Sequence, residues 1–126
     1  MNIKSSPKLS QIAIKIMSAY TYWSDLTRFI PKMRRYSLGI KIDTSFSDLI
    51  ELISIAQFST GERRVDALGR AITKNDVLKF LLYSLQELGG MEMKKFLDLS
   101  EKLEEIGQML YGWKNQAQKQ TAQMIK

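Results

Sequence analysis

The residues of this sequence that could do chemistry are mainly cations, and they gather in two segments. The first, residues 28–41, has no acidic residue and places Tyr36 among five basic side chains: Arg28, Lys32, Arg34, Arg35 and Lys41. The second contributes four more: Arg63, Arg64, Arg70 and Lys74. Because Lys and Arg neutralise phosphates and an aromatic ring stacks on a base, the two segments predict nucleic-acid binding. The alternative for the first segment is a solvated loop followed by the first turn of a helix.

Catalysis has little support in this sequence. The chain contains no histidine, the usual general base at neutral pH, and no cysteine to act as a thiolate nucleophile or metal ligand. It also lacks a glycine-rich phosphate loop and the Glu-x-x-His pairs of a di-metal bundle. Lysine, tyrosine and carboxylate groups remain chemically capable, so a small enzyme is the weakest of three hypotheses. We expect a binding protein with no metal and no cofactor.

The charge balance favours an anionic partner. The 126 residues include 19 Lys and Arg against 13 Asp and Glu, which gives a net charge of +6. Such a surface suits RNA, DNA or an acidic protein, although a charge of this size also simply aids solubility. No apolar run approaches the ~20 residues that span a bilayer, and the N-terminus has no apolar core of a signal peptide. We therefore expect no membrane contact and a cytoplasmic location.

Four amphipathic helices must position these cations. Apolar residues recur at intervals of three and four along most of the chain, which predicts helices over about residues 7–29, 33–58, 59–88 and 91–113. No segment alternates with a period of two, so no strand is expected. Helices of this length joined by short turns predict an all-α, antiparallel up-and-down four-helix bundle. The whole chain, 1–126, is one domain in this interpretation, with frayed tails at 1–6 and 115–126.

Turn and capping residues set the predicted helix boundaries. Ser6 followed by Pro7 is typical of a helix start, and Pro31 ends the first helix because it disfavours the α conformation of the preceding residue. The segment Ser59–Glu62 matches a capping box at the start of the third helix. Gly89 is the expected left-handed residue that ends it.

Spare apolar surface on the second and third helices indicates contact with another subunit. The third helix is either broken at Thr73–Asp76 or continuous, and we favour the continuous form. In that form three of its apolar side chains point away from the alanine and leucine stripe, as three do on the second helix. These six residues form the predicted oligomer interface: Ile40, Ile55, Phe58, Val65, Leu68 and Ile72.

The last helix carries glycine inside a strong apolar stripe. That stripe consists of Phe96, Leu99, Leu103, Ile106, Leu110 and Trp113. A glycine within a helix costs about 1 kcal/mol relative to alanine, so Gly107 predicts a close helix contact that offsets this cost. We expect that contact with the second helix, near Gly39. Gly39, Gly107 and Trp113 are therefore predicted to be structural.

Two stretches together resemble a known family. Ile30-Pro31-Lys32 with Arg35–Gly39, and later Glu105–Trp113, are similar to the four-helix-bundle family of accessory variability determinant (Avd) proteins of diversity-generating retroelements. The same family includes proteins encoded in intervening sequences of bacterial ribosomal RNA genes. The resemblance implies a homopentamer with a basic surface, which in the retroelement members binds the partner reverse transcriptase and its template RNA.

The resemblance leaves two main functional hypotheses. In the first, the chain is a non-catalytic retroelement accessory protein that binds the reverse transcriptase, RNA and DNA through the nine cations named above. In the second, it is an assembly module of the intervening-sequence type, without a specific nucleic-acid role. By the resemblance Lys32, Arg35, Gly39, Gly107 and Trp113 occupy family-typical positions, with the glycines and Trp113 as scaffold.

Overall fold

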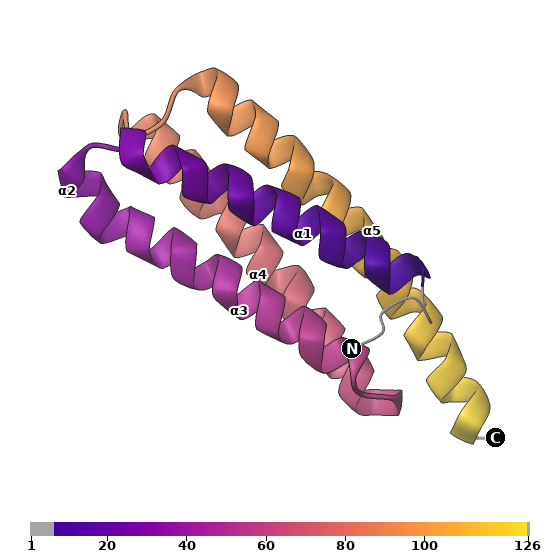
Figure 1. Ribbon diagram of the computed structural model, residues 1–126. Coiled ribbons are helices and arrows are strands. Elements are labelled where there is room, and N and C mark those ends of the chain that lie inside the picture. Colours follow the sequence, from indigo (N-terminus) through magenta and orange to yellow (C-terminus); the bar gives the residue numbers. More distant parts are fainter. Residues whose placement is uncertain (1–6, 126) are drawn as a thin grey trace.

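The protein is built from helices alone over the part of the chain that is described. The computed structural model describes the backbone of residues 7–125 and the side chains of residues 11–123, so the predicted cap at Ser6 lies outside the described residues. The elements in order are α1 (Pro7–Leu26), the 3-10 turn η1 (Thr27–Phe29), α2 (Lys32–Arg34), the π-helical turn η2 (Arg35–Gly39), α3 (Ile40–Gln57), α4 (Gly61–Glu87) and α5 (Met93–Ile125) (Figure 1). The predicted all-α four-helix bundle is confirmed.

The four long helices form an up-and-down bundle. Helix α4 lies between α3 and α5 and packs along both, while α1 lies on the opposite side against α5 and α3. Each helix is therefore antiparallel to the next one along the chain, as short connections require. No helix within residues 7–125 is long and apolar enough to cross a membrane.

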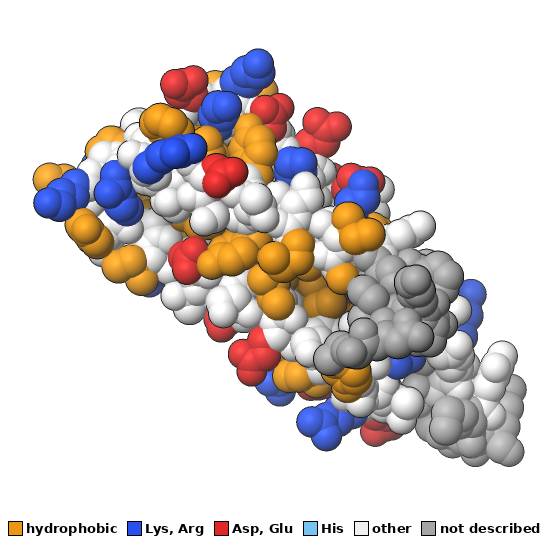
Figure 2. Space-filling view, viewed as in Figure 1, with side chains coloured by type: hydrophobic (Ala, Val, Ile, Leu, Met, Phe, Trp, Pro, Cys, Tyr) orange, Lys and Arg blue, Asp and Glu red, His pale blue; other side chains and the backbone are white. Residues whose placement is uncertain are grey.

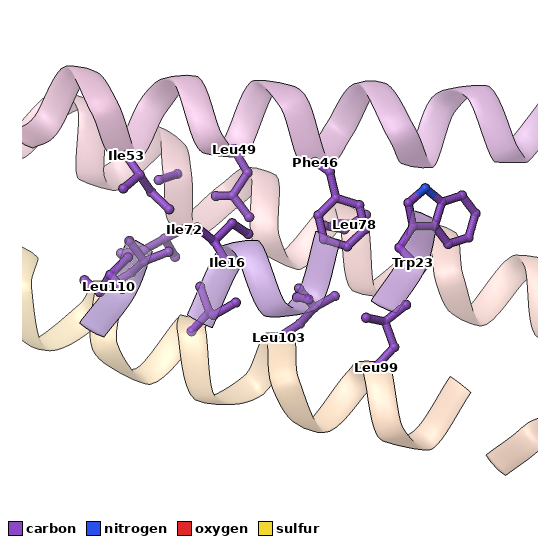
Figure 3. Packing of buried hydrophobic residues seen from close by; sticks show 14 of the residues in the cluster. Ile16, Trp23, Phe46, Leu49, Ile53, Ile72, Leu78, Leu99, Leu103 and Leu110 are labelled. Carbon is purple, nitrogen blue, oxygen red and sulfur yellow. The ribbon is translucent and has the colours of Figure 1, made fainter. Parts of the chain in front are cut away.

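All four helices contribute an apolar stripe to one continuous core. Trp23 of α1, Phe46 of α3, Leu78 of α4 and Leu103 of α5 are fully buried and represent the four stripes (Figure 3). The predicted stripe of the last helix is confirmed, since its members from Leu99 onward are buried and Phe96 packs against the core. Burial of these large side chains is the main force that holds the bundle together.

The connection from α1 to α3 is a sharp corner rather than a loop. Ile30 adopts an extended backbone before Pro31, as expected for a residue that precedes proline. The carbonyl of Pro31 then accepts bonds from the backbone N–H groups of Arg34 and Arg35, both at 2.9 Å, so helical structure resumes at once. The predicted boundaries of the first two helices agree with the structure to within a few residues.

Helix α4 is continuous from Gly61 to Glu87, as predicted. The accompanying expectation that Leu68 and Ile72 face another subunit is wrong, because these side chains are 0% and 7% exposed within the chain's own core. The reason is that α4 packs against two neighbours, α3 and α5, and so buries a wider face than a helix with one neighbour.

The two ends of α4 differ in how well they were predicted. No side chain caps its N-terminus, where Thr60 is the boundary residue, so the predicted Ser59–Glu62 capping box does not form. At the other end Gly89 has a φ of +77°, and Gly90 donates its N–H to the carbonyl of Leu85 at 2.9 Å. This is the expected glycine-terminated end.

Helix α5 is longer than the sequence suggested. It continues past the predicted end at Trp113 to Ile125, and its final part runs beyond the turn between α3 and α4 (Figure 1). Ala117, within the expected frayed tail, is 3% exposed because it packs on the core. The glutamine-rich composition of this tail concealed the continuing helical repeat of Leu110, Trp113 and Ala117.

Gly107 makes a close contact, but not with the predicted helix. A side chain added at Gly107 would come within 3.1 Å of the amide nitrogen of Asn75 on α4, whereas Gly39 lies near Arg34 and Arg35 of its own segment. Asn75 is 1% exposed and donates from that nitrogen to the carbonyl of Leu103 at 3.0 Å. The glycine therefore gives a buried amide room to reach the backbone of α5. The expected contact of Gly107 with Gly39 is wrong.

Candidate nucleic-acid and partner interface

The structure places the first basic segment at one end of the bundle and Arg63 and Arg64 at the other, while Arg70 and Lys74 lie further along α4. One end, here called the η1–α2 end, consists of the corner between α1 and α3 and the adjacent turn between α4 and α5. The other, the α3–α4 end, consists of the turn between α3 and α4 and the part of α5 beyond Trp113. The 18 residues of α3 separate the two ends by about 27 Å at 1.5 Å per residue. The two basic segments therefore do not form one surface within a single chain.

Arg35 stabilises the corner at the η1–α2 end. Its guanidinium donates from Nη2 to the carbonyl oxygen of Ile30 at 3.0 Å and to that of Arg28 at 3.2 Å. These carbonyls follow α1, where helical hydrogen bonding has stopped and acceptors are left over. Arg35 is half-buried, so its guanidinium serves the fold rather than an exposed phosphate site.

Arg64 does the same at the α3–α4 end. It donates from Nε to the carbonyl oxygen of Ala56 at 2.9 Å and from Nη2 to that of Gln57 at 3.3 Å, at the C-terminus of α3. Its guanidinium also lies 5.7 Å from the ring centre of Trp113, which is 6% exposed. The structural role predicted for Trp113 agrees with this packing, in which Arg64 also takes part.

Arg70 and Lys74 are occupied by acidic neighbours. Arg70 pairs with Asp66 at 3.0 Å and Lys74 with Asp48 at 3.4 Å. Both cations line an open groove of about 820 Å³ along the outer side of α3 and α4. Arg63 is exposed at the start of α4 and forms no ion pair with the described side chains. The second basic segment thus offers little uncompensated charge.

The η1–α2 end keeps its cations unpaired. Arg28, Lys32 and Lys41 are exposed and Arg34 is half-buried, and none of them forms an ion pair within the described side chains. Tyr36, predicted as a stacking residue, is 61% exposed beside them. Most of the first basic segment therefore remains available to a partner, with Arg35 as the exception.

Two further cations join this end that the sequence reading did not single out. Lys94 and Lys95 begin α5 and are exposed, and neither forms an ion pair among residues 11–123. The glycine turn at Gly89 returns the chain to the end of α1, which brings Lys95 beside Phe29 and Ile30 of the first basic segment, with Lys94 next to it along the chain. The signal was present in the sequence, because an antiparallel bundle must place the start of its fourth helix next to the end of its first.

An apolar pocket lies within this basic end. Its volume is about 570 Å³, and its lining comes from the end of α1, the corner and the glycine turn: Leu26, Phe29, Ile30, Pro31, Gly89, Gly90, Met91, Glu92 and Lys95. Phe29 is 74% exposed, and the guanidinium of Arg28 lies 5.2 Å from the centre of its ring. Figure 2 shows hydrophobic and basic side chains side by side at this end of the molecule, on the left of the view.

Tyr22 links the basic start of α5 to α1. Its hydroxyl donates to Oδ2 of Asp98 at 2.9 Å, and the ammonium groups of Lys95 and Lys102 lie 5.9 and 5.6 Å from the centre of its ring. Burial, followed by the hydrogen bond to Asp98, raises the pKa of Tyr22 above 10.0. The phenol is therefore neutral at physiological pH and serves as a donor and as a surface for the lysines.

The six residues predicted for the oligomer interface do not form one patch. Besides the buried Leu68 and Ile72, the exposed Ile40 and Phe58 lie at opposite ends of α3. Ile55 and Val65 do share a surface, because both line the groove along α3 and α4 together with Leu52 and Val77. This groove is the part of the predicted interface that the fold brings together.

Comparison with known proteins supplies one match. A family model described as bAvd-like matches residues 9–117, which include both basic segments and most of α5. No match was found among curated proteins or among solved structures.

Proposed function

The chain belongs to the bAvd-like family, and from that premise we propose that it is a non-catalytic accessory protein of a diversity-generating retroelement. In this role it binds the partner reverse transcriptase and the template RNA or cDNA through basic surface. The observation that supports this proposal is the group of unpaired cations at the η1–α2 end: Arg28, Lys32, Arg34, Lys94 and Lys95.

The physical basis of the nucleic-acid contact is phosphate neutralisation. Each Lys or Arg that pairs with a phosphate releases a condensed counterion, so affinity gains from every contact and falls steeply with salt. Lys32 and Arg34 project from the short α2 next to the exposed ring of Tyr36, which offers a base-stacking surface beside the charges. No covalent chemistry is required of the chain.

The proposal includes assembly into a homo-oligomer, with a pentamer as the expected form. The groove along α3 and α4 supports it, because Leu52, Ile55, Val65 and Val77 line the groove. Four of its charged side chains are paired within the chain, as Arg70–Asp66 and Lys74–Asp48. Several copies would present several η1–α2 ends to one RNA, which raises the effective affinity without any new contact. A light-scattering mass of the purified protein tests this part, and a monomer at micromolar concentration would reject it.

The central experiment measures RNA binding as a function of salt. Binding is measured by fluorescence anisotropy with a labelled single-stranded RNA of about 20 nucleotides. The affinity for this RNA should fall by orders of magnitude between about 50 and 200 mM salt. The double variant Lys32→Gln/Arg34→Gln should bind about tenfold more weakly and with a shallower salt slope. Arg63→Gln/Lys119→Gln, which removes two exposed cations at the other end of the bundle, is the matched control. Salt-independent binding, or equal binding by both variants, would reject the nucleic-acid role.

A second candidate function is an assembly module whose positive charge is incidental. The exposed apolar side chains favour it, since Phe29, Met33 and Phe80 are each at least 70% exposed. The two candidates differ in what co-purifies with the chain from its native host. A protein partner without nucleic acid, shown by the absorbance ratio of the complex, would favour the assembly module over the retroelement role.

A further inference from the structure

We propose that the apolar pocket at the η1–α2 end binds a short segment of a protein partner, in which a large apolar side chain stands next to an acidic residue. The proposal rests on the proposed function, which supplies a protein partner, and adds the chemistry of the segment and the place where it binds. The apolar side chain fills the pocket between α1 and the glycine turn, and the carboxylate pairs with Arg28 and Lys95 at its rim.

The lining of the pocket favours a polypeptide over a nucleic acid. Five of its lining side chains are apolar, namely Leu26, Phe29, Ile30, Pro31 and Met91. A base read in a pocket requires polar partners for its edges, but the charged side chains of this lining are only Glu92 and Lys95. An aliphatic or aromatic side chain needs no such polar partners.

The cations at the rim determine the charge of the occupant. Lys95 lines the pocket and is exposed, and the guanidinium of Arg28 lies 5.2 Å from the ring centre of Phe29, which also lines the pocket. Neither has an ion-pair partner within the described part of the chain, whereas Arg70 and Lys74 at the other groove are paired. Arg28 and Lys95 together outnumber Glu92, the one acidic residue of the lining, so charge complementarity favours a carboxylate close to the apolar anchor.

The glycine turn forms one wall of the pocket with a backbone that is held in place. A side chain at Gly90 would collide with Leu85, and Gly89 has a φ of +77°, a conformation that side chains other than glycine rarely adopt. The turn therefore faces the pocket with backbone alone. The hydrogen bond from Gly90 N–H to the carbonyl of Leu85, at 2.9 Å, fixes that backbone. A site formed in advance loses little conformational entropy on binding.

Selection from a random peptide library tests the chemistry of the occupant. Peptides of about 12 residues displayed on phage are selected against the full-length protein, and the enriched ones are synthesised with a fluorescent label. We expect the enriched peptides to share a Leu, Phe or Met next to an Asp or Glu. Failure to enrich any peptide, or enrichment of peptides without that pair, would overturn the proposal.

Matched variants then test the place of binding. Phe29→Ala removes a pocket wall and Lys95→Glu inverts the rim charge, and each should weaken the enriched peptides about tenfold. The controls are Phe80→Ala, which removes a similarly exposed ring outside the pocket, and Lys119→Glu, which inverts a lysine at the other end. If the controls weaken peptide binding as much as the pocket variants, the pocket is not the site.

RNA binding by the pocket variant separates this proposal from the proposed function. Because the peptide and the RNA share Arg28 and Lys95, they should compete, but Phe29→Ala should weaken only the peptides and bind the labelled single-stranded RNA as the parent does. If RNA binding depends on Phe29 as strongly as peptide binding does, the pocket is a nucleic-acid site and the present proposal is wrong. Conversely, peptide binding that survives while RNA binding proves salt-independent would reject the nucleic-acid role and leave the pocket assigned.

Discussion

Both ends of the bundle have an arginine that caps a helix, but they differ in the surface around it. At each end an arginine turns back to the carbonyl groups that the preceding helix leaves unbonded, Arg35 after α1 and Arg64 after α3. At the α3–α4 end Arg64 also lies over Trp113, and the extension of α5 packs alongside. At the η1–α2 end unpaired cations and exposed apolar side chains surround an open pocket. A basic run near a helix end therefore contains two populations, one that serves the carbonyls and one that is free.

The largest effect on stability should come from the interior that both ends share. Gly107→Leu places a side chain where Asn75 lies 3.1 Å away, and overpacking together with loss of a buried hydrogen bond should lower the free energy of unfolding by about 3 kcal/mol. Gly112→Leu is the control, because a Cβ added at Gly112 meets no atom of another helix within 4 Å. Thermal unfolding measures both. Equal stability of the two variants would show that the close contact of Gly107 with Asn75 does not contribute to the stability of the bundle.

The next largest effect distinguishes the capping arginines from the free cations. Arg64→Met and Arg35→Met each remove charge-assisted hydrogen bonds to carbonyls, and each should lower the free energy of unfolding by about 2 kcal/mol. Arg63→Met, an exposed neighbour, should change it by less than about 0.5 kcal/mol. Urea titration of the three variants measures this difference. Similar values for Arg63 and Arg64 would remove the distinction between the two populations.

Replacement of the exposed cations at the η1–α2 end should have the opposite pattern, with little effect on stability and a large effect on RNA binding. Lys32→Gln/Lys94→Gln at the η1–α2 end should leave stability within about 0.5 kcal/mol and weaken RNA binding by about 1.4 kcal/mol, or tenfold. Arg63→Gln/Lys119→Gln, a pair from the α3–α4 end, should bind RNA as the parent does. The anisotropy titrations measure both affinities. If the second pair weakens RNA binding as much as the first, both ends contribute equally and the contrast between them fails.

The smallest effect concerns high pH. Burial, followed by a hydrogen bond to Asp43, raises the pKa of Tyr20 above 10.0, and burial with the hydrogen bond to Asp98 does the same for Tyr22. Because the unfolded chain then loses its phenolic protons first, the stabilisation is complete below pH 10 and is lost as pH rises above it. Tyr20→Phe/Tyr22→Phe should show a smaller loss of stability over that range.

Tryptophan fluorescence gives the readout for the pH effect. The chain has two tryptophans, Trp23 and Trp113, and only Trp23 donates to Asp43, at 3.3 Å, next to Tyr20. In a Trp113→Phe background, the signal of Trp23 should change as pH rises above 10, and the tyrosine variants should shift that change. Burial lowers the pKa of Lys79, but its hydrogen bonds to Glu104 and Asp76 outweigh burial and raise that pKa on balance; Lys79 is present in every variant. An identical pH profile with and without the tyrosines would refute the assignment.

The fold was largely predictable because it depends on periodicity. The spacing of apolar residues within each helix predicts the four stripes, to which Ile12, Phe46, Leu78 and Leu103 belong in turn. Pro31 and Gly89 predict two of the turns through their backbone conformations alone. The errors arose where the outcome depends on a neighbour. Whether Leu68 faces outward depends on how many helices flank α4, which the sequence of α4 alone does not contain.

The candidate site was less predictable because charge has no periodicity. Arg35 and Arg64 look like their neighbours Arg34 and Arg63 in the sequence, and only the position of nearby carbonyl groups separates the members of each pair. Lys95 joins the first basic segment through the antiparallel return of α5. The pocket combines parts from the end of α1, the corner and the glycine turn, so no single stretch of sequence contains it.

The buried amide of Asn75 also fixes the alignment of α5 along α4. Its nitrogen reaches the carbonyl of Leu103 only because Gly107 stands one turn further along α5. If α5 slid by one helical turn, about 5.4 Å, the side chain of Leu103 or Tyr111 would meet the amide instead of the glycine. A single polar pair in an apolar helix interface thus specifies the register of the two helices. It determines how far α5 projects at both ends, and so sets the distance between Lys95 and the corner at Pro31.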